Sequence, residues 1–506
     1  MHKIKIEVAG TYFTVHPLNP LTKELVELFK ELFLTYSLVK KNNRFFKEVD
    51  REFYASLKVR NKYTFIREAL PVFVEKMKEC NITRNDIDIV VIPDFPVRTI
   101  DLEPHPVYEP RGKQTLYVDA MVNTEEAFTL TNAPTGSGKT IMACLALQRI
   151  NKATLIIVKP AYIEKWISDI MDATTATRDE LLVIKNTKHL IETMEAVDSG
   201  DINPPFILIS NRLLILYIKE YENAIMDKMF KHPYTPYEIA EKLAIGVTLV
   251  DEIHEEFFSI FKILMYLNVK KNLGLSATLE TNDEDIRKMQ YLLFPSKNRL
   301  KFLTDSKYID VTAIDYPIRN KDGVKFDAPG DRGYSHVVLE QSIMRNKQWL
   351  ANYLKMIVFL TSVYYFRHKK DNDKLIIFAS TIDMCNIITR TLKKHYKQLD
   401  VRKYTAGDPY ENVIEPDIRI STVGKAGTAI DIPGLTTVIQ TINILSIVSN
   451  VQTIGRLRDI PGKKLNFVYL FSSSIKKHKE YHYKRQSMLK RKAKSYKVVD
   501  YLGYVK

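Results

Sequence analysis

The sequence predicts an α/β protein in which a small α+β domain precedes two tandem parallel-sheet domains. Two observations lead to this prediction. Short runs of consecutive apolar residues recur between helical segments, which is typical of parallel strands that are buried on both faces. The pattern occurs in two successive series, and 506 residues are too many for a single hydrophobic core.

The small α+β domain is predicted over residues 1–108. Ile4, Ile6 and Val8 alternate with polar residues, which indicates a strand with one buried face. The other elements predicted here are a strand over 12–15, helices over 21–34 and 65–80, and a strand over 87–92. Five prolines between positions 93 and 110 mark the boundary that follows.

The two parallel-sheet domains are predicted over 109–300 and 301–475. In the first domain, the strand runs lie at 127–131, 154–158, 206–209, 247–250 and 273–276. The second begins with an irregular connection carrying one strand near 309–318. Its further runs lie at 375–378, 418–422, 437–440 and 467–470.

The positive charge is concentrated in the last residues, 476–506, which we treat as a basic C-terminal tail. The chain has a net charge of +15, and residues 472–506 hold eleven Lys and Arg against Glu480 and Asp500. Such a segment attracts a polyanion, most often nucleic acid. A solvated tail, or a helix that packs on the second domain with its lysines facing water, explains the same composition.

Composition also argues against several classes of protein. The longest apolar stretch, residues 356–366, is too short to cross a membrane. The three cysteines have no metal-ligand spacing, so we expect no zinc or iron–sulfur site. Unpaired cysteines also favour a reducing cytoplasm, which is the host's cytoplasm if the protein is phage-encoded.

The most informative motif is the glycine-rich octapeptide at 133–140, which follows a predicted strand and opens a helix-like run. Its glycines let backbone N–H groups turn toward a phosphate, and the helix N-terminus adds its positive dipole end. Lys139 is expected to reach the β- and γ-phosphates, and the Thr140 hydroxyl to hold Mg²⁺. A chance glycine-rich turn is the alternative. The other loop residues expected at the nucleotide are Pro134, Thr135, Gly136, Ser137 and Gly138.

Two further strand ends carry polar residues that suit a magnesium–nucleotide site. The run at 247–250 leads into Asp251, which is expected to hold the metal, and Glu252, which is expected to polarise the attacking water. An exposed acidic turn is the alternative, and a position after a buried strand disfavours it. The next strand ends at Ser276 and Thr278, whose hydroxyls can hydrogen-bond the acidic motif.

In the second domain, Arg456 and Arg458 are candidates for an arginine finger. An arginine that faces a γ-phosphate from another domain stabilises transition-state charge and makes hydrolysis depend on domain closure. Surface arginines in a helical turn are the alternative. A loop of small residues at 424–434 can approach both nucleotide and nucleic-acid backbone.

Taken in order, these motifs resemble those of superfamily 2 helicases of the DExH type, over about residues 111–470. The resemblance implies two RecA-like domains and an ATP hydrolase coupled to nucleic-acid unwinding. It assigns adenine recognition to Gln114 and places Asp431 and Gln452 at the nucleotide. It implies coupling roles for His254, Ser276, Thr278 and Gly427. It also implies a sequence-independent grip on the nucleic-acid backbone by Lys159, Pro160, Ser210, Asn211, Ser380, Thr405 and Thr422.

The sequence departs from the pattern of this superfamily in two places. Many members carry the second arginine three residues after the first, whereas Arg458 follows Arg456 by two and Asp459 takes the usual position. Arg456 is therefore the better candidate for the finger. The loop around Ala429 also lacks a glycine that many relatives place just before the equivalents of Ile430 and Asp431.

Within the superfamily, the layout is most similar to the phage UvsW group of branch-migration helicases, which implies an accessory or DNA-binding role for residues 1–108. The function expected is therefore an ATP- and Mg²⁺-dependent DNA helicase or translocase. Its expected substrate is branched or single-stranded DNA, remodelled by fork regression or junction branch migration in replication, recombination or repair. We expect no membrane partner, and the sequence does not indicate an oligomeric state.

Two alternatives stay open at this point. One is an RNA helicase or RNA–protein remodeller that uses the same ATP-driven machinery. The other is a non-catalytic DNA-binding recombination factor with a relict ATP site. The intact Lys139, Thr140, Asp251 and Glu252 argue against the relict.

Overall fold

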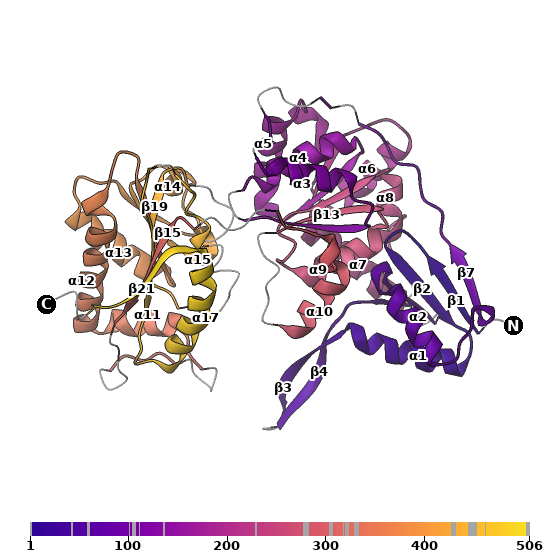
Figure 1. The fold of residues 1–506 in the computed structure, drawn as a ribbon, viewed down its shortest axis with the longest axis horizontal. Coiled ribbons are helices and arrows are strands. Elements are labelled where there is room, and N and C mark those ends of the chain that lie inside the picture. The colour runs from indigo at the N-terminus through magenta and orange to yellow at the C-terminus, as the bar shows by residue number, and fades with distance from the viewer. Residues whose placement is uncertain are drawn as a thin grey trace. The chain divides into compact units, whose positions relative to one another are not determined.

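The computed structural model describes the chain apart from residues 1–2, 42–43, 58–60, 101, 104–107, 111, 135–136, 228–229, 277–282, 303–306, 317, 319–322, 328–332, 427–431, 444–452, 461 and 502–506. The chain divides into two compact units, Met1–Leu303 and Thr304–Lys506 (Figure 1). The predicted fold class is confirmed, because each unit contains a seven-stranded parallel sheet and the first also contains a small mixed sheet. Among the described residues, no helix is long and apolar enough to cross a membrane.

The N-terminal residues form a five-stranded sheet in which β1 pairs antiparallel with β2 and parallel with β7. In spatial order its strands are β5 Ala55–Leu57, β6 Lys62–Ile66, β2 Tyr12–Pro17, β1 Ile4–Val8 and β7 Ile87–Val91. Helices α1 Pro20–Lys30 and α2 Leu70–Glu79 accompany the sheet. The rings of Phe29 and Phe65, 4.9 Å apart, contribute to the core of this region.

One local prediction in this region was wrong, and one element was missed. The helix expected from residue 65 begins at Leu70, because Phe65 and Ile66 belong to β6 and a 3-10 turn follows them. A hairpin of β3 Leu34–Lys41 and β4 Arg44–Glu52 was not predicted at all. Its strands pair only with each other among the described residues.

The N-terminal sheet shares a hydrophobic core with the first parallel sheet. Backbone N–H of Thr11 donates to Oδ1 of Asn268 at 3.3 Å. The rings of Phe53 and Phe261 lie 5.1 Å apart, edge to face. Residues 1–108 therefore pack as part of the first unit, and the boundary at 108 stays a prediction.

The first parallel sheet places the strand of the glycine-rich loop, β8, beside β13 and one strand away from β12. In spatial order its strands are β10 Leu181–Ile184, β11 Phe206–Ser210, β9 Thr154–Val158, β12 Val247–Val250, β13 Lys271–Ser276, β8 Phe128–Asn132 and β14 Arg299–Leu300. The helices of this part are α3 Gln114–Asn123, α4 Lys139–Ile150, α5 Ile163–Ala173, α6 Thr187–Asp198, α7 Asn211–Asp227, α8 Ile239–Lys242, α9 Phe257–Leu267 and α10 Glu284–Leu293.

The second unit contains the other parallel sheet. In spatial order its strands are β17 Val401–Tyr404, β18 Ile418–Thr422, β16 Lys374–Ala379, β19 Leu435–Gln440, β20 Leu465–Phe471, β15 Ile309–Asp315 and β21 Ala493–Asp500. Its helices are α11 His336–Arg345, α12 Lys347–Tyr364, α13 Ile382–His395, α14 Glu411–Ile414, α15 Val423–Ala426 and α17 Lys476–Lys492.

The basic C-terminal residues are an integral part of this second sheet. Helix α17 buries Met488 and Leu489 in the same cluster as Ile454 and Leu457. Strand β21 then pairs in parallel with β15. Of the explanations given for this segment, the structure agrees with a helix that packs on the second domain while its lysines face water.

Candidate nucleotide site and nucleic-acid contacts

The carboxyl ends of five neighbouring strands bring the motifs of the first unit to one edge of the parallel sheet. Because all these strands run in the same direction, residues that follow them meet at that edge. Strand by strand from β11 through β9, β12 and β13 to β8, the ends carry Ser210, Lys159, Asp251, Ser276 and the glycine-rich loop.

The glycine-rich loop ends at Gly138, which adopts a φ of +81° and immediately precedes helix α4. This positive φ disfavours any residue with a side chain, and a Cβ here would also require the Gln114 amide, 2.8 Å away, to move. The Gln114 amide donates to the carbonyl oxygen of Ser137 at 2.7 Å. The Ser137 hydroxyl is buried and has no hydrogen-bond partner in the part of the chain that the structure describes. A helix N-terminus with an unused hydroxyl beside it suits a phosphate.

Asp251 is held by a hydrogen bond that the sequence did not indicate. Nε1 of Trp166, a fully buried residue of α5, donates to Asp251 Oδ2 at 2.8 Å. Burial and the neighbouring Glu252 raise the pKa of Asp251 above its usual range, while Trp166 and then Lys139 oppose that rise. A buried tryptophan in a helix is an ordinary core residue. Only the fold shows that the indole N–H of Trp166 lies against Asp251.

Thr140 and Asp251 supply the kinds of oxygen that Mg²⁺ prefers. Thr140 Oγ1 accepts from Nζ of Lys165 at 3.5 Å, and Lys165 also forms an ion pair with Asp169. The positive charge of Lys165 also acts on Asp251, lowering its pKa. One cation thus interacts with both predicted metal-binding residues, which fits a position that a metal ion would share.

The acidic motif is connected to Ser276 through His254. Nδ1 of His254 lies 2.8 Å from Ser276 Oγ and 3.3 Å from Glu252 Oε2. Burial lowers the pKa of His254, so the ring is neutral; its Nδ1 hydrogen-bonds Ser276 and lies beside the Glu252 carboxylate. Glu252 itself has a φ of +45°, a conformation that costs a non-glycine residue of order 1–3 kcal/mol and is found most often at functional sites.

Two predicted nucleic-acid contacts are tied to the same loop by acids that the sequence analysis did not single out. The ammonium group of Lys159 forms an ion pair with Glu255. The side-chain amide of Asn211 donates to Glu256 Oε2 at 2.8 Å. The signal was present, because these two acids directly follow His254. Pro160 begins a short 3-10 turn, and the Ser210 hydroxyl accepts from the backbone N–H of Leu213 at 3.2 Å.

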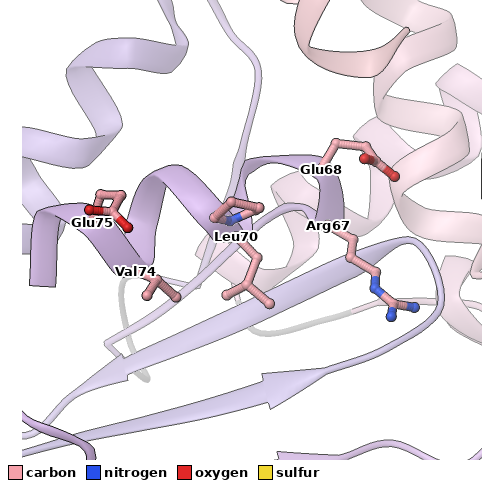
Figure 2. Close-up of a pocket in the computed structure, with 6 residues that line it drawn as sticks. Arg67, Glu68, Leu70, Val74 and Glu75 are labelled. Carbon is pink, nitrogen blue, oxygen red and sulfur yellow. The ribbon is translucent and has the colours of Figure 1, made fainter. Parts of the chain in front are cut away.

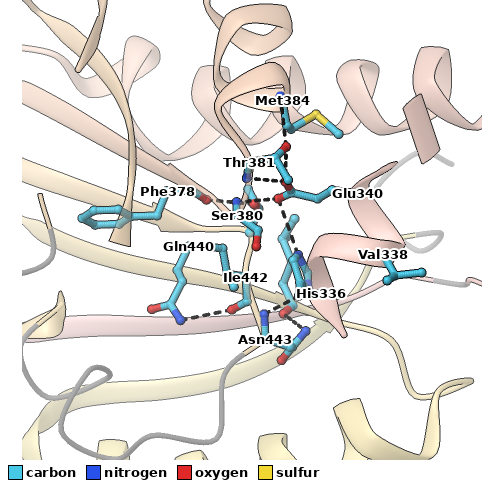
Figure 3. A network of polar contacts seen from close by, with 12 residues as sticks. His336, Val338, Glu340, Phe378, Ser380, Thr381, Met384, Gln440, Ile442 and Asn443 are labelled. Carbon is cyan, nitrogen blue, oxygen red and sulfur yellow. Dashed lines mark hydrogen bonds and ion pairs between the residues drawn. The ribbon is translucent and has the colours of Figure 1, made fainter. Parts of the chain in front are cut away.

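In the second unit, Ser380, Thr405 and Thr422 lie at the carboxyl ends of the neighbouring strands β16, β17 and β18. The Thr405 hydroxyl donates to Asp408 at 2.9 Å and is used within its own turn. Backbone N–H of Ser380 donates to Oε1 of Glu340 at 2.7 Å (Figure 3).

Glu340 organises the loop around Ser380, and the sequence analysis missed it. Its carboxylate also accepts from the backbone N–H and the hydroxyl of Thr381, both at 2.8 Å, and His336 lies 3.7 Å away. Burial raises the pKa of Glu340 to about 7, against the opposing effect of the bonds from Ser380 and Thr381. Nothing in the spacing of α11 marks this position, since a lone glutamate in an amphipathic helix is normally exposed.

The other predicted residues of the second unit are placed only in part. Arg456 is 8% exposed, and its backbone N–H donates to the carbonyl of Thr453 at 3.4 Å. The two units are described separately, so a role of Arg456 or Arg458 at the nucleotide stays a prediction. Outside the described residues lie Thr135, Gly136, Thr278, Gly427, Asp431 and Gln452.

A cavity of about 460 Å³ opens at the start of α2, away from these motifs (Figure 2). Its described lining is Arg67, Glu68, Leu70, Pro71, Val74 and Glu75. Burial raises the pKa of Glu68, and Glu126 adds to the effect. The lining includes no predicted site residue, so the strand ends define the candidate site.

Comparison with known proteins supports this location. Residues 107–281 match the family model described as type III restriction enzyme, res subunit. They include the glycine-rich loop, the acidic motif and Ser276. The helicase/translocase subunit XPB of general transcription and DNA repair factor IIH from Enterocytozoon bieneusi is 22% identical over 419 residues, 80% of this chain and 65% of that protein. The chain is related to superfamily 2 helicases.

A further curated relative and a solved structure also match the chain. The XPB subunit of Encephalitozoon cuniculi is 24% identical over 76% of this chain and 56% of its own length. The chain therefore spans less than two thirds of each of these relatives. Among solved structures, T4 UvsW aligns over 99% of this chain and 100% of its own, with 14% identity and a TM-score of 0.35. The curated relatives are helicase/translocase subunits, which is the enzyme class that the motifs predict.

The substitution Asp251→Asn is predicted to stabilise the first unit at pH 8. An aspartate whose native pKa is raised loses stability on ionising, so the cost is present at pH 8 and vanishes as the pH falls through the ordinary aspartate range near 4. We expect a gain of about 1–3 kcal/mol in the free energy of unfolding, measured in urea. The exposed Asp179→Asn is the control, with a change below about 0.5 kcal/mol. Loss of stability in Asp251→Asn at pH 8 would contradict the assignment.

The substitution Glu340→Gln is predicted to remove a pH dependence from the second unit. The native pKa near 7 lies above the usual glutamate value, so the wild-type unit loses stability as the pH rises from about 4 to about 7. Glutamine does not ionise, so the variant has no such loss. The melting temperature of the variant minus that of the wild type should therefore increase from pH 5 to pH 8. The exposed Glu411→Gln serves as control. Parallel melting curves of Glu340→Gln and wild type across this range would refute the prediction.

Proposed function

We propose that this chain is an ATP- and Mg²⁺-dependent DNA helicase or translocase that remodels branched DNA. The observation that carries the proposal is the connected series of contacts at the edge of the first sheet. It runs from Trp166 to Asp251 and Glu252, and from Glu252 through His254 to Ser276. The series lies between the phosphate-binding loop and residues predicted to hold nucleic acid.

Bound MgATP would supply the phosphoanhydride whose hydrolysis drives the cycle. Lys139 and the N-terminus of α4 would bind the phosphates, while Thr140 and Asp251 would hold the metal ion. Glu252 accepts a hydrogen bond from the attacking water and orients it. Because Glu252 also contacts His254, a change at the reacting phosphate alters the position of Ser276 at the end of β13.

The same loop connects hydrolysis to the nucleic acid. Glu255 and Glu256 hold Lys159 and Asn211, two of the residues that we assign to the DNA backbone. A movement of residues 251–256 therefore shifts both contacts together. We assign the role of the arginine finger to Arg456 of the second unit.

DNA is the proposed substrate for two reasons. The curated relatives are subunits of general transcription and DNA repair factor IIH. The layout of the chain, an α+β region before two parallel-sheet domains, resembles that of the phage UvsW group of branch-migration helicases, and this resemblance supports a branched substrate. The test measures ATPase stimulation and strand separation with single-stranded DNA, four-way DNA junctions and RNA. Preferential stimulation by RNA would overturn the choice of DNA.

Glu252→Gln is predicted to bind ATP normally and to hydrolyse it at least about 10²-fold more slowly, because the amide cannot accept a proton from water. Nucleotide binding and steady-state ATPase activity with DNA are the two measurements. Glu192→Gln, an exposed change on α6, is the matched control and should keep full activity. Normal turnover by Glu252→Gln would remove the role assigned to Glu252.

A further inference from the structure

Helix α17 presents two chemically different faces. The inner face consists of buried residues, namely His478, His482, Arg485, Met488 and Leu489. The outer face, which we call the basic face, consists of exposed residues at helical spacing, namely Lys476, Lys477, Lys479, Tyr483, Lys484 and Lys490. Such a division into two faces follows from the 3.6-residue period of a helix that packs on a sheet.

The inner face fixes the helix rigidly against the sheet. Nδ1 of His478 accepts from the backbone N–H of Ser472 at 3.0 Å. The ring of His482 stacks on Phe471, with centroids 3.9 Å apart. The guanidinium of Arg485 lies over Tyr469, 4.6 Å from the ring centroid. Because these contacts fix the orientation of the helix, the opposite face is held exposed to solvent.

The basic face carries a surplus of positive charge. Its single acid, Glu480, pairs with Lys477 at 2.8 Å and with Lys484 at 3.4 Å. No carboxylate lies within ion-pair distance of Lys476, Lys479 or Lys490 among the described residues, although Lys490 lies over the Tyr496 ring. The surplus continues into β21, where Lys494 and Lys497 are also exposed.

We propose that the basic face of α17 binds the phosphate backbone of duplex DNA. This proposal rests on the proposed function and adds to it a second contact, separate from the strand-end residues, for one arm of a branched substrate. A helix of 17 residues is roughly 25 Å long, enough to follow several phosphates along one groove edge. Lysine ammonium groups on flexible stems contact phosphates without selecting a base sequence.

The composition of the face favours duplex over single-stranded DNA. Sites for single strands combine basic residues with several aromatic side chains on which successive bases stack. The basic face has one exposed aromatic ring, Tyr483, which is 60% exposed. A row of lysines with a single exposed aromatic ring is better suited to the phosphate backbone of a duplex than to the unstacked bases of a single strand.

Removing residues 476–506 cannot test this proposal, because the truncation also removes β21 from the sheet and the inner face from the core. The triple substitution Lys476→Ala, Lys479→Ala, Lys490→Ala changes only exposed side chains. Its matched control is Lys393→Ala, Lys394→Ala, Lys397→Ala, which removes three exposed lysines at and just after the end of α13. Both variants have the same net charge, so any difference between them comes from position.

The measurement is the affinity for a duplex and for a four-way junction at several salt concentrations. Each lost phosphate contact lowers the slope of log affinity against log salt by about 0.9, so the α17 variant should lose up to about 2.7 and the control little. ATPase stimulation by single-stranded DNA should stay at the wild-type level in both. Equal slopes in the two variants, or a loss confined to single-stranded DNA, would overturn the proposal. If the wild type shows no DNA-stimulated ATPase, the proposed function fails, and the slope comparison still decides whether α17 binds DNA.

Discussion

The arrangement of the candidate site depends on one constraint, that parallel strands buried on both faces must all end at the same edge of their sheet. A polar side chain inside such a strand must find its partner within the core, whereas the residues that follow the strands can face a ligand. In the first unit this edge collects the glycine-rich loop, the acidic motif and Ser276 from strands β8, β12 and β13. The second unit repeats the arrangement with Ser380, Thr405 and Thr422.

At this edge the acids of residues 251–256 are held by a different partner each. Asp251 has Trp166, Glu252 has His254, Glu255 has Lys159, and Glu256 has Asn211. Grouping four carboxylates is unfavourable because of mutual repulsion and burial, as the raised pKa of Asp251 reflects. His254 belongs to the loop itself, whereas Trp166, Lys159 and Asn211 come from α5, from the turn after β9 and from the start of α7, so the loop depends on several neighbouring segments for its conformation.

Much of the fold followed from the sequence because periodicity reports burial directly. The strands β9, β12 and β18 were predicted within a residue, since unbroken apolar runs leave little choice of boundary. The β3–β4 hairpin was missed although Leu34, Tyr36 and Leu38 alternate with polar residues, because this short alternation directly follows a predicted helix. The C-terminal strand β21 was missed because its lysines and serine face water at the edge of the sheet.

The site was predictable where chemistry imposes a spacing, as in the glycine-rich loop and the acidic motif. It was not predictable where a partner is brought in by tertiary structure alone. Trp166 and Glu340 are such partners, and neither has a local pattern that distinguishes it from a core tryptophan or a surface glutamate. The sequence therefore indicated the reacting groups more completely than the residues that position them.

Strand β15 has a consequence for how the second unit folds. Both of its neighbours, β20 and β21, come from far along the chain, and the bond from Ser495 to Asp310 joins residues 185 positions apart. Contacts of such long range form slowly, because the entropy of closing the loop is lost before the contacts form. The second sheet therefore keeps an open, hydrogen-bonding edge at β15 until late in folding. During that interval β15 is the place where pairing with another chain competes with the native fold.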